Sequence, residues 1–176
     1  MIKTMRIFSI TVLTLVVLFS QQTGNRGYIV EVGDQCPDFS MTLADGKSIT
    51  LNDMKGKVFM LQFTASWCSV CRKEMPHIES EIWQQYKDQG LVVIGVDRDE
   101  PLEVVQNFAK EMKISYPLAL DPGSEIFKKF AFENSGVTRN ILVDRDGKII
   151  HLTRLYDEAE FHGLVKHIGE LIQASL

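Results

Sequence analysis

The chain has 176 residues, of which 45% are hydrophobic and 24% are charged, and its formal net charge is −4. This length and composition suit one globular domain with its own core, whereas two domains would be cramped. Because the balance is acidic and no basic stripe appears, nucleic acid is not expected as a partner.

The first twenty residues have the pattern of a targeting segment. Lys3 and Arg6 precede an apolar run over residues 7–19, as in the charged and hydrophobic regions of a signal peptide. The run is short for a membrane span, which needs about 20 apolar residues. Its end fits a small-residue cleavage site poorly, because Leu18 and Phe19 are large. We therefore predict an exported protein with a signal peptide or an uncleaved N-terminal anchor over residues 1–20.

The rest of the chain divides into a linker and one domain. The polar residues that follow the apolar run predict a linker over residues 21–30, and the folded domain is predicted over residues 31–176. Within that domain, Asp45-Gly46 is a strong hairpin signal between two short apolar stretches, 39–43 and 48–51.

Two nearly continuous apolar runs predict strands that are buried on both faces. They cover Val58–Phe63 and Leu91–Val96, and such runs are typical of a sheet covered by helices. The charged residues that follow the second run, Asp97 to Glu100, are expected to form a solvated loop. A later pair of strands, Ile141–Val143 and Lys148–Leu152, is predicted to form a hairpin.

Helical periodicity appears between and after these strands. A helix is predicted from about Cys68 to Gln89, with Pro76 inside it as the cause of a kink. Pro101 is expected to open a second helix, and a short helix is predicted around Glu125–Phe130. The last helix has Asp157 as its N-cap and Glu160 three residues later. This alternation predicts an α/β protein with a central sheet and helices on both faces.

A close cysteine pair is the strongest chemical signal in the sequence. Cys68 and Cys71 fall where a predicted strand ends and a helix begins. The free N–H groups and the positive dipole end of a helix N-terminus stabilise an anion. We therefore expect Cys68, the outer thiol, to have a pKa below the usual value of about 8.5 and to attack as a thiolate. Cys71, which lies deeper, is expected to resolve the mixed disulfide.

Two other interpretations of the pair are less favoured. Half of a zinc site has the same spacing, but such a site needs four ligands, and Cys36 and His77 would complete it only by coincidence of folding. A purely structural disulfide would close a very short loop and constrain the unfolded chain little. Neither a metal nor a cofactor is expected. Cys36 itself is interpreted as a small buried hydrophobe, with a disulfide to a partner as the minority alternative.

The residues around the pair resemble a known family. The motif Trp67-Cys68-x-x-Cys71, followed by Glu74 and Pro76, resembles the thioredoxin superfamily and within it the exported TlpA/ResA-like thiol–disulfide oxidoreductases. The likeness spans roughly residues 31–174 and includes the segments 32–39, 45–47, 51–57 and 141–148. It implies a thioredoxin fold, with a central mixed sheet, helices on both faces and an N-terminal β-hairpin extension.

The resemblance also implies roles for neighbouring residues. Glu74 lies on the same helix face as Cys71. It is either a solvated carboxylate or, as the resemblance implies, an acid/base near the buried thiol. Gln62 stands where thioredoxins proper carry a buried acid, and it cannot exchange a proton at neutral pH. Trp67 is expected to be a packing shield beside the pair, and Pro76 is expected to shape the helix.

The sequence departs from the family pattern at two positions. Val70 stands where the family usually has proline, which is expected to change the redox potential but not the reaction type. The usual cis-proline facing the cysteines is matched by Thr138, which follows Val137. A cis peptide before threonine costs about 2.5–4 kcal/mol, so a trans peptide is expected. This change affects the loop that ordinarily pairs with the substrate backbone.

Thr138 leads to an expectation about the redox couple. Its N–H and its hydroxyl are both donors, and either one is expected within reach of the Cys68 thiolate, beside a pair that is more open than with proline. Both effects favour the reduced dithiol. Thr138→Pro is therefore expected to make the couple more reducing by tens of millivolts.

With this resemblance, the sequence predicts an enzyme that exchanges disulfides with protein substrates outside the cytoplasm. A reductant role is favoured, in the periplasm or at the inner membrane, with electrons from a membrane or periplasmic donor. The alternatives are a non-catalytic thioredoxin-like binding module and a peroxiredoxin-like peroxidase. The peroxidase pattern Pro-x-x-x-Thr-x-x-Cys is not matched, since Thr64 is four residues before Cys68 and no proline precedes it suitably.

Overall fold

A computed structural model describes residues 26–174, so the predicted signal peptide or anchor over residues 1–20 lies outside the described part. The strands are β1 (Ser40–Leu43), β2 (Ser48–Thr50), β3 (Phe59–Thr64), β4 (Val92–Arg98), β5 (Leu118–Asp121), β6 (Arg139–Val143) and β7 (Ile149–Arg154). The α-helices are α1 (Ser69–His77), α2 (Gln84–Tyr86), α3 (Leu102–Met112) and α4 (Glu158–Gln173). A π-helical segment, η2 (Ile78–Trp83), joins α1 to α2, and short 3₁₀ turns occur at Leu51–Met54, Lys87–Gln89, Pro122–Ser124 and Phe127–Lys129.

The seven strands form one mixed sheet in the order β2-β1-β5-β4-β3-β6-β7. The central strand β3 pairs in parallel with β4 and antiparallel with β6. The predicted hairpin over 39–51 is confirmed, and it extends the sheet because β1 pairs with β5. β5 is a strand that the sequence analysis missed. It has four residues and begins directly after Pro117. Such a short segment shows no recognisable alternation of apolar and polar residues.

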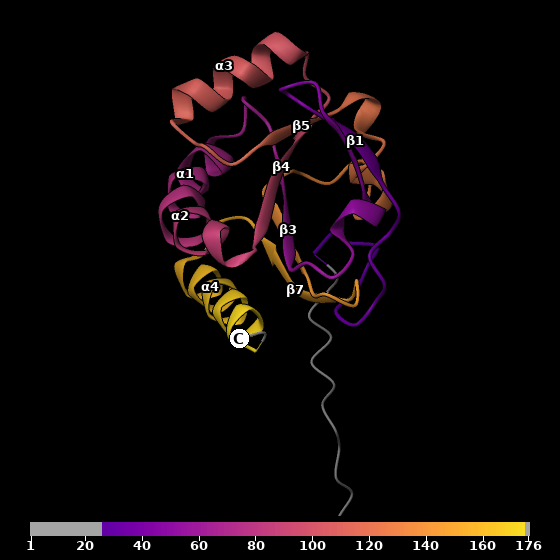
Figure 1. The fold of residues 1–176 in the computed structure, drawn as a ribbon. Helices are drawn as coiled ribbons and strands as arrows, with labels where there is room; N and C mark the ends of the chain where they lie inside the picture. The colour runs from indigo at the N-terminus through magenta and orange to yellow at the C-terminus, as the bar shows by residue number, and fades with distance from the viewer. Residues whose placement is uncertain (1–25, 175–176) are drawn as a thin grey trace, which may run out of the picture.

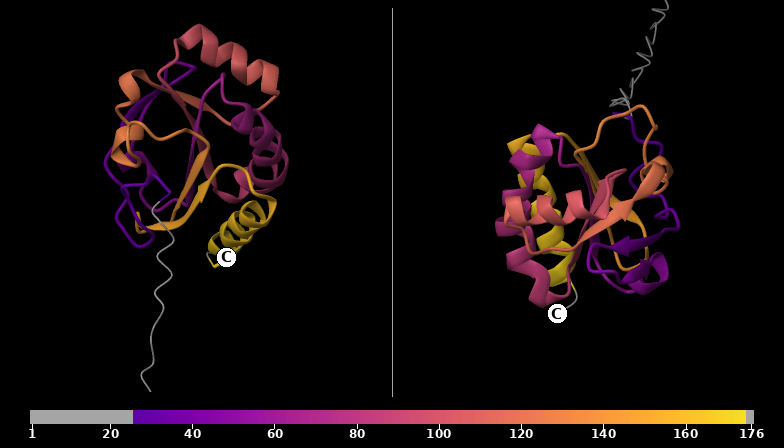
Figure 2. Two further views of the ribbon diagram at one scale, coloured as in Figure 1. Left: turned by 180° about the vertical axis from the view of Figure 1, so that it is seen from behind. Right: turned by 90° about the horizontal axis from the view of Figure 1, so that it is seen from above.

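Two hydrophobic clusters cover the sheet, one on each face. Side chains that alternate along β3 point to opposite sides, so Met60 lies in one cluster and Leu61 in the other. Figures 1 and 2 show the long helices gathered on one side of the sheet and the β1–β2 hairpin on the other. The helical side buries Ile78, Ile82, Val105, Phe108, Phe161, Leu164 and Ile168. The opposite side is covered by 3₁₀ turns and by the N-terminal segment, including Met54, Phe127, Phe130, Tyr28 and Phe39.

The packed domain begins before the predicted boundary at residue 31. Tyr28 and Val30 fall within the predicted linker, yet both side chains are buried. The hydroxyl of Tyr28 donates to the carbonyl oxygen of Thr153 at 2.5 Å, and the backbone N–H of Ile29 donates to the carbonyl oxygen of Phe130 at 2.9 Å. The last part of the predicted linker, residues 28–30, therefore contributes two side chains to the core, although polar residues precede it.

The first long helical segment runs over nearly the predicted range but changes its winding. α1 contains Pro76 and gives way at Ile78 to the π-helical turn η2. Proline lacks the N–H that an α-helix needs and crowds the preceding turn, and π-turns are a recognised cause of helix irregularity. The predicted last helix is confirmed as α4, where the side chain of Asp157 accepts from the Glu160 N–H at 3.0 Å.

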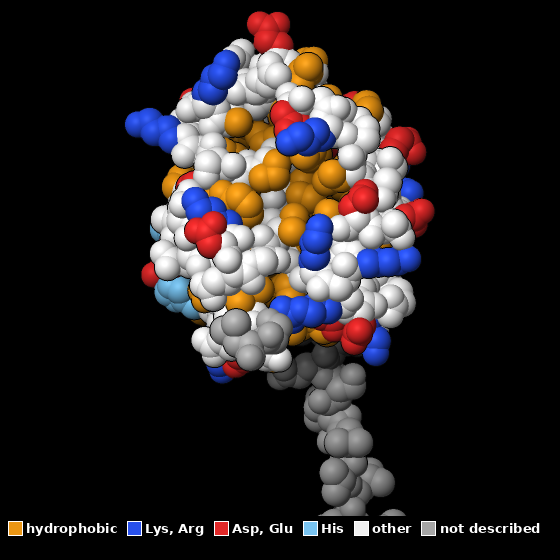
Figure 3. Space-filling view, viewed as in Figure 1, with side chains coloured by type: hydrophobic (Ala, Val, Ile, Leu, Met, Phe, Trp, Pro, Cys, Tyr) orange, Lys and Arg blue, Asp and Glu red, His pale blue; other side chains and the backbone are white. Residues whose placement is uncertain are grey.

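Within residues 26–174, no helix is long and apolar enough to cross a membrane. Figure 3 shows hydrophobic side chains near the middle of the face viewed in Figure 1, while positive and negative side chains are interspersed around them. This face therefore carries no large patch of a single charge sign.

Candidate active site

The cysteine pair lies at the junction between the central strand and the first helix. β3 ends at Thr64, and Cys68 is the N-cap of α1. Its sulfur accepts from the backbone N–H of Cys71 at 3.1 Å, as an N-cap side chain does. Cys68 and Cys71 form a disulfide with Cα atoms 5.3 Å apart. The position expected from the sequence, at a helix N-terminus, is thus the one observed.

The two sulfurs differ in their access to solvent. Cys68 is 9% exposed and Cys71 is fully buried. Cys68 is therefore the thiol that a large partner can reach first, and Cys71 can be reached only through it. The order proposed from the sequence, with an outer attacking and an inner resolving thiol, is compatible with this geometry.

Thr138 lies directly against both sulfurs. Its hydroxyl oxygen is 3.0 Å from the Cys68 sulfur and 2.9 Å from the Cys71 sulfur. Its peptide bond is trans, as expected, and its φ is +67°. A positive φ is strained for a β-branched residue, so the surrounding structure holds this geometry in place.

Of the two donors of Thr138, only the hydroxyl is available to the sulfurs. Its backbone N–H is not free to reach a thiolate, because it donates to the carbonyl oxygen of Phe63 at 3.0 Å. Its own carbonyl oxygen accepts from the Leu155 N–H at 2.9 Å. Thr138 is fully buried against the sulfurs. Only the hydroxyl remains as a donor to Cys68 or Cys71.

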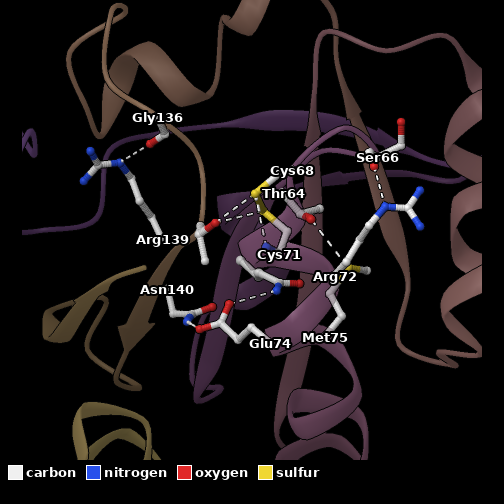
Figure 4. Close-up of a disulfide and its surroundings, with 12 residues drawn as sticks. Thr64, Ser66, Cys68, Cys71, Arg72, Glu74, Met75, Gly136, Arg139 and Asn140 are labelled. Carbon is white, nitrogen blue, oxygen red and sulfur yellow. Dashed lines mark hydrogen bonds between the residues drawn. A yellow bond between two sulfur atoms is a disulfide. The ribbon is translucent and has the colours of Figure 1, made fainter. Parts of the chain in front are cut away.

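Glu74 is buried one turn below the disulfide, and so it is not the solvated carboxylate of the first alternative. Its oxygens accept from the Gln62 side-chain amide at 3.2 Å and the Asn140 side-chain amide at 2.7 Å. Figure 4 shows Glu74 and Asn140 facing each other. Burial raises the Glu74 pKa to about 7, although both amide hydrogen bonds act to lower it. Its carboxyl group can therefore gain and lose a proton near neutral pH.

A pH-dependent stability follows from the Glu74 pKa. The folded protein holds this proton up to about pH 7, whereas the unfolded chain releases it near the ordinary glutamate pKa of 4.5. The free energy of unfolding should therefore fall as pH rises from about 4.5 to about 7. Glu74→Gln, which cannot titrate, should remove roughly 3 kcal/mol of that fall. Urea unfolding of both proteins at pH 4.5 and pH 7.5 measures the difference, and equal pH slopes would show that Glu74 does not titrate this way.

The hydrogen-bond partners that define the Glu74 environment could not be predicted from the sequence. Asn140 lies in β6, where its side chain also donates to the Thr153 hydroxyl at 2.9 Å. The Tyr116 hydroxyl donates to the Gln62 side-chain oxygen at 2.8 Å. The only available signal was a polar residue inside an apolar strand, since Asn140 directly precedes Ile141-Leu142-Val143. Figure 4 also shows the neighbouring Arg139 directed toward Gly136 and away from the disulfide.

The remaining predicted site residues lie around the pair in different ways. Trp67 was expected to pack as a shield, but it is 64% exposed, so most of its indole faces solvent beside Cys68. Val137 is buried next to Thr138. Pro76 lies farther along α1, near the start of the π-turn, and takes part in shaping the helix rather than in contacting the sulfurs.

Hydrogen bonds to two side chains, Glu100 and Arg72, fix the turn between β3 and α1. The Glu100 carboxylate accepts from the Ser66 N–H at 2.5 Å and from the Ser66 hydroxyl at 2.6 Å. The Ser66 carbonyl oxygen accepts from the side chain of Arg72 at 2.6 Å. The solvated loop predicted over residues 97–100 is therefore only partly correct. Asp97 and Arg98 belong to β4, and Asp97 is fully buried, whereas Asp99 is exposed.

Cys36 is a free, buried thiol, as the favoured interpretation predicted. Burial and the nearby Asp38 raise its pKa to about 12, which keeps it protonated and unreactive at neutral pH. In the described part of the chain, no group of three His, Cys, Asp or Glu side chains is arranged to hold a metal ion.

Cys36→Ala is therefore expected to leave disulfide exchange within about twofold of wild type, because the thiol serves packing rather than chemistry. An insulin reduction assay, with circular dichroism as the check on folding, measures this. Loss of most activity in a folded variant would assign Cys36 a chemical role.

Known proteins resemble this chain in sequence and in fold. The AhpC/TSA family model matches residues 32–152. A thiol-disulfide oxidoreductase ResA from Bacillus thuringiensis subsp. konkukian (strain 97-27) is 39% identical over 121 residues, which are 69% of this chain and 68% of the relative. Both likenesses include the cysteine pair and the strand–helix junction that carries it.

Solved structures agree with these relatives. The solution structure of a candidate protein disulfide isomerase from Bacteroides thetaiotaomicron is 58% identical, with a TM-score of 0.81 over 84% of this chain and 93% of that one. The crystal structure of a candidate thiol:disulfide interchange protein DsbE from Chlorobium tepidum is 26% identical, with a TM-score of 0.72 over 81% and 99% of the two chains. The predicted thioredoxin fold is thereby confirmed. This chain belongs to the AhpC/TSA family and, within it, to the ResA-like thiol–disulfide oxidoreductases.

Proposed function

We propose that this enzyme reduces disulfides of protein substrates outside the cytoplasm, with Cys68 as the attacking thiol and Cys71 as the resolving thiol. The observation that carries the choice of Cys68 as the attacking thiol is the environment of its sulfur. It is the more exposed member of the pair, at 9% against 0% for Cys71, and two donors, the Cys71 N–H and the Thr138 hydroxyl, lie within 3.1 Å. Hydrogen bonds to a charged acceptor contribute about 1.5–3 kcal/mol, so both donors favour the thiolate.

The exchange then proceeds in two balanced steps. The Cys68 thiolate attacks one sulfur of a substrate disulfide, and the other substrate sulfur leaves as a thiolate that takes up a proton. Cys71 loses its proton and attacks the Cys68 sulfur, which releases the second substrate thiol and closes the Cys68–Cys71 disulfide. Glu74, one turn deeper and with a pKa of about 7, is proposed as the acid/base that exchanges the Cys71 proton.

Return to the dithiol requires an electron donor, for which we propose a thiol protein of the membrane or periplasm. The charged and apolar pattern of residues 1–20 supports export, with this segment as either a signal peptide or an anchor. The exposed indole of Trp67, which directly precedes Cys68 in the chain, supports docking of an extended protein segment over the pair. No metal or cofactor enters these steps.

An insulin reduction assay tests the proposed activity. With dithiothreitol as the electron source, the enzyme should accelerate insulin reduction well above the rate with dithiothreitol alone. Peroxide consumption under the same conditions should stay at background. Peroxide turnover without insulin reduction would instead favour a peroxidase, and neither activity would favour a binding module.

A further inference from the structure

Asp97 is a buried acid to which no other group donates a hydrogen bond within residues 26–174. It lies near the end of β4, level with Thr64 of β3, and it is fully buried. An ionised carboxylate in such a place is costly, so the group requires either a counter-charge or a proton.

The charged groups around Asp97 do not supply a counter-charge. Those that act on it most are Glu100, in the loop after β4, and Asp121, at the end of β5, and both are acids. The nearby cations bind elsewhere. Arg98 donates to Ser124, Ser135 and Glu133, and Arg72 donates to Ser66 and Glu111. A proton is therefore the remaining way to stabilise Asp97.

The position of that proton follows from the hydrogen bonds of Glu100. Both Glu100 oxygens accept from Ser66, one from its N–H and the other from its hydroxyl. Glu100 is thus the carboxylate of the pair. The Asp97 and Glu100 side chains lie within hydrogen-bonding reach of each other, and this contact is a hydrogen bond only if the Asp97 carboxyl group is the donor. Ser66 in turn lies two residues before Cys68, in the turn that carries Trp67.

We propose that Asp97 is a positioning residue of the active site, whose neutral carboxyl group donates to Glu100 and so holds Ser66 and the turn that presents Cys68. Loss of the proton would place the buried Asp97 carboxylate against the half-buried Glu100 carboxylate, and their repulsion would weaken the hydrogen bonds from Ser66 to Glu100. Burial, reinforced by Glu100, raises the pKa of Asp97 to about 8. The turn is therefore held below about pH 8 and loosened above it.

The most direct readout is hydrogen exchange of the Ser66 amide, measured by NMR at pH 6.5 and pH 9 and corrected for intrinsic exchange. In wild type, its protection should fall by about tenfold or more between the two pH values. In Asp97→Asn, whose amide donates at every pH, the protection should stay within about twofold. Glu100→Gln should show weak protection at both values. Glu103→Gln, which changes an exposed acid of α3, should behave like wild type.

The kinetic counterpart is the ratio of insulin reduction rates of Asp97→Asn and wild type. It should be near one at pH 6.5 and rise several-fold through an inflection near pH 8, whereas a merely structural residue would give a constant ratio. This part rests on the proposed function, but the amide exchange does not. If wild type does not reduce insulin, the proposed function is contradicted, but the role of Asp97 in holding Ser66 is not. Equal pH dependence of Ser66 protection in wild type and Asp97→Asn would overturn the role of Asp97.

Discussion

Cys71→Ser is expected to accumulate a mixed disulfide with a protein substrate through Cys68, whereas Cys68→Ser should trap none. The reason is access, because Cys68 is 9% exposed at the helix N-terminus and Cys71 is fully buried beneath it. Without Cys71 the first exchange proceeds but cannot be resolved. Without Cys68 the remaining thiol cannot be reached by a folded partner. Both variants should reduce insulin only at the rate of dithiothreitol alone.

The trapping experiment is sharpest in a Cys36→Ala background, which removes the third thiol from the described part of the chain. Non-reducing electrophoresis and mass spectrometry then identify the adduct and the cysteine that carries it. Equal trapping by the two serine variants, or an adduct on Cys71, would mean that the order of the two thiols is reversed.

Thr138→Val is expected to make the Cys68–Cys71 couple more reducing by about 30–60 mV. The substitution removes the hydroxyl that lies within 3.0 Å of both sulfurs and keeps the branched shape of the side chain. A hydrogen bond to a thiolate contributes about 1.5–3 kcal/mol, and about 30 mV corresponds to 1.4 kcal/mol in a two-electron couple. Loss of this bond destabilises the reduced form, so the potential becomes more negative. Equilibration with glutathione measures it.

Thr138→Ser is the matched control, since it keeps the hydroxyl and should hold the potential within about 10 mV of wild type. Thr138→Pro is a poorer test than the sequence suggested. Proline cannot adopt the φ of +67°, and it would remove the hydrogen bond to the Phe63 carbonyl oxygen. An unchanged potential in Thr138→Val, or a shift toward a more oxidising couple, would show that the hydroxyl does not stabilise the thiolate.

Much of the fold could be predicted because local signals agreed with the global architecture. The continuous apolar run at Val58–Phe63 forms the central strand β3. Asp45-Gly46 forms the turn of the β1–β2 hairpin, and Asp157 caps the last helix. β5 escaped detection because its four residues are stabilised by pairing with β4 and β1, which no local pattern reveals. Tyr28 and Val30 escaped for a similar reason, since their burial depends on distant segments.

The candidate site was predictable only in part. The cysteine pair could be predicted, because its spacing and its position at a strand–helix junction are local properties of the sequence. The state of Glu74 depends on amides from β3 and β6, which are far apart in the sequence. Asp97 looked like one charge in a solvated run, and only the packing of β4 between β3 and β5 shows that it is buried. The position of Thr138 opposite the cysteines could be predicted from the sequence. That its hydroxyl, and not its N–H, is available to the sulfurs depends on the pairing of its backbone with Phe63.

The redox potential of the Cys68–Cys71 couple tests the proposed reductant role most directly. A thioredoxin-like couple lies near about −270 mV, and the Thr138 hydroxyl should raise it by about 30–60 mV. A value between about −240 and −210 mV is therefore expected from equilibration with glutathione at pH 7, followed by alkylation and mass spectrometry of the dithiol. A value near about −120 mV, typical of a disulfide-forming oxidase, would contradict the proposed role as a reductant.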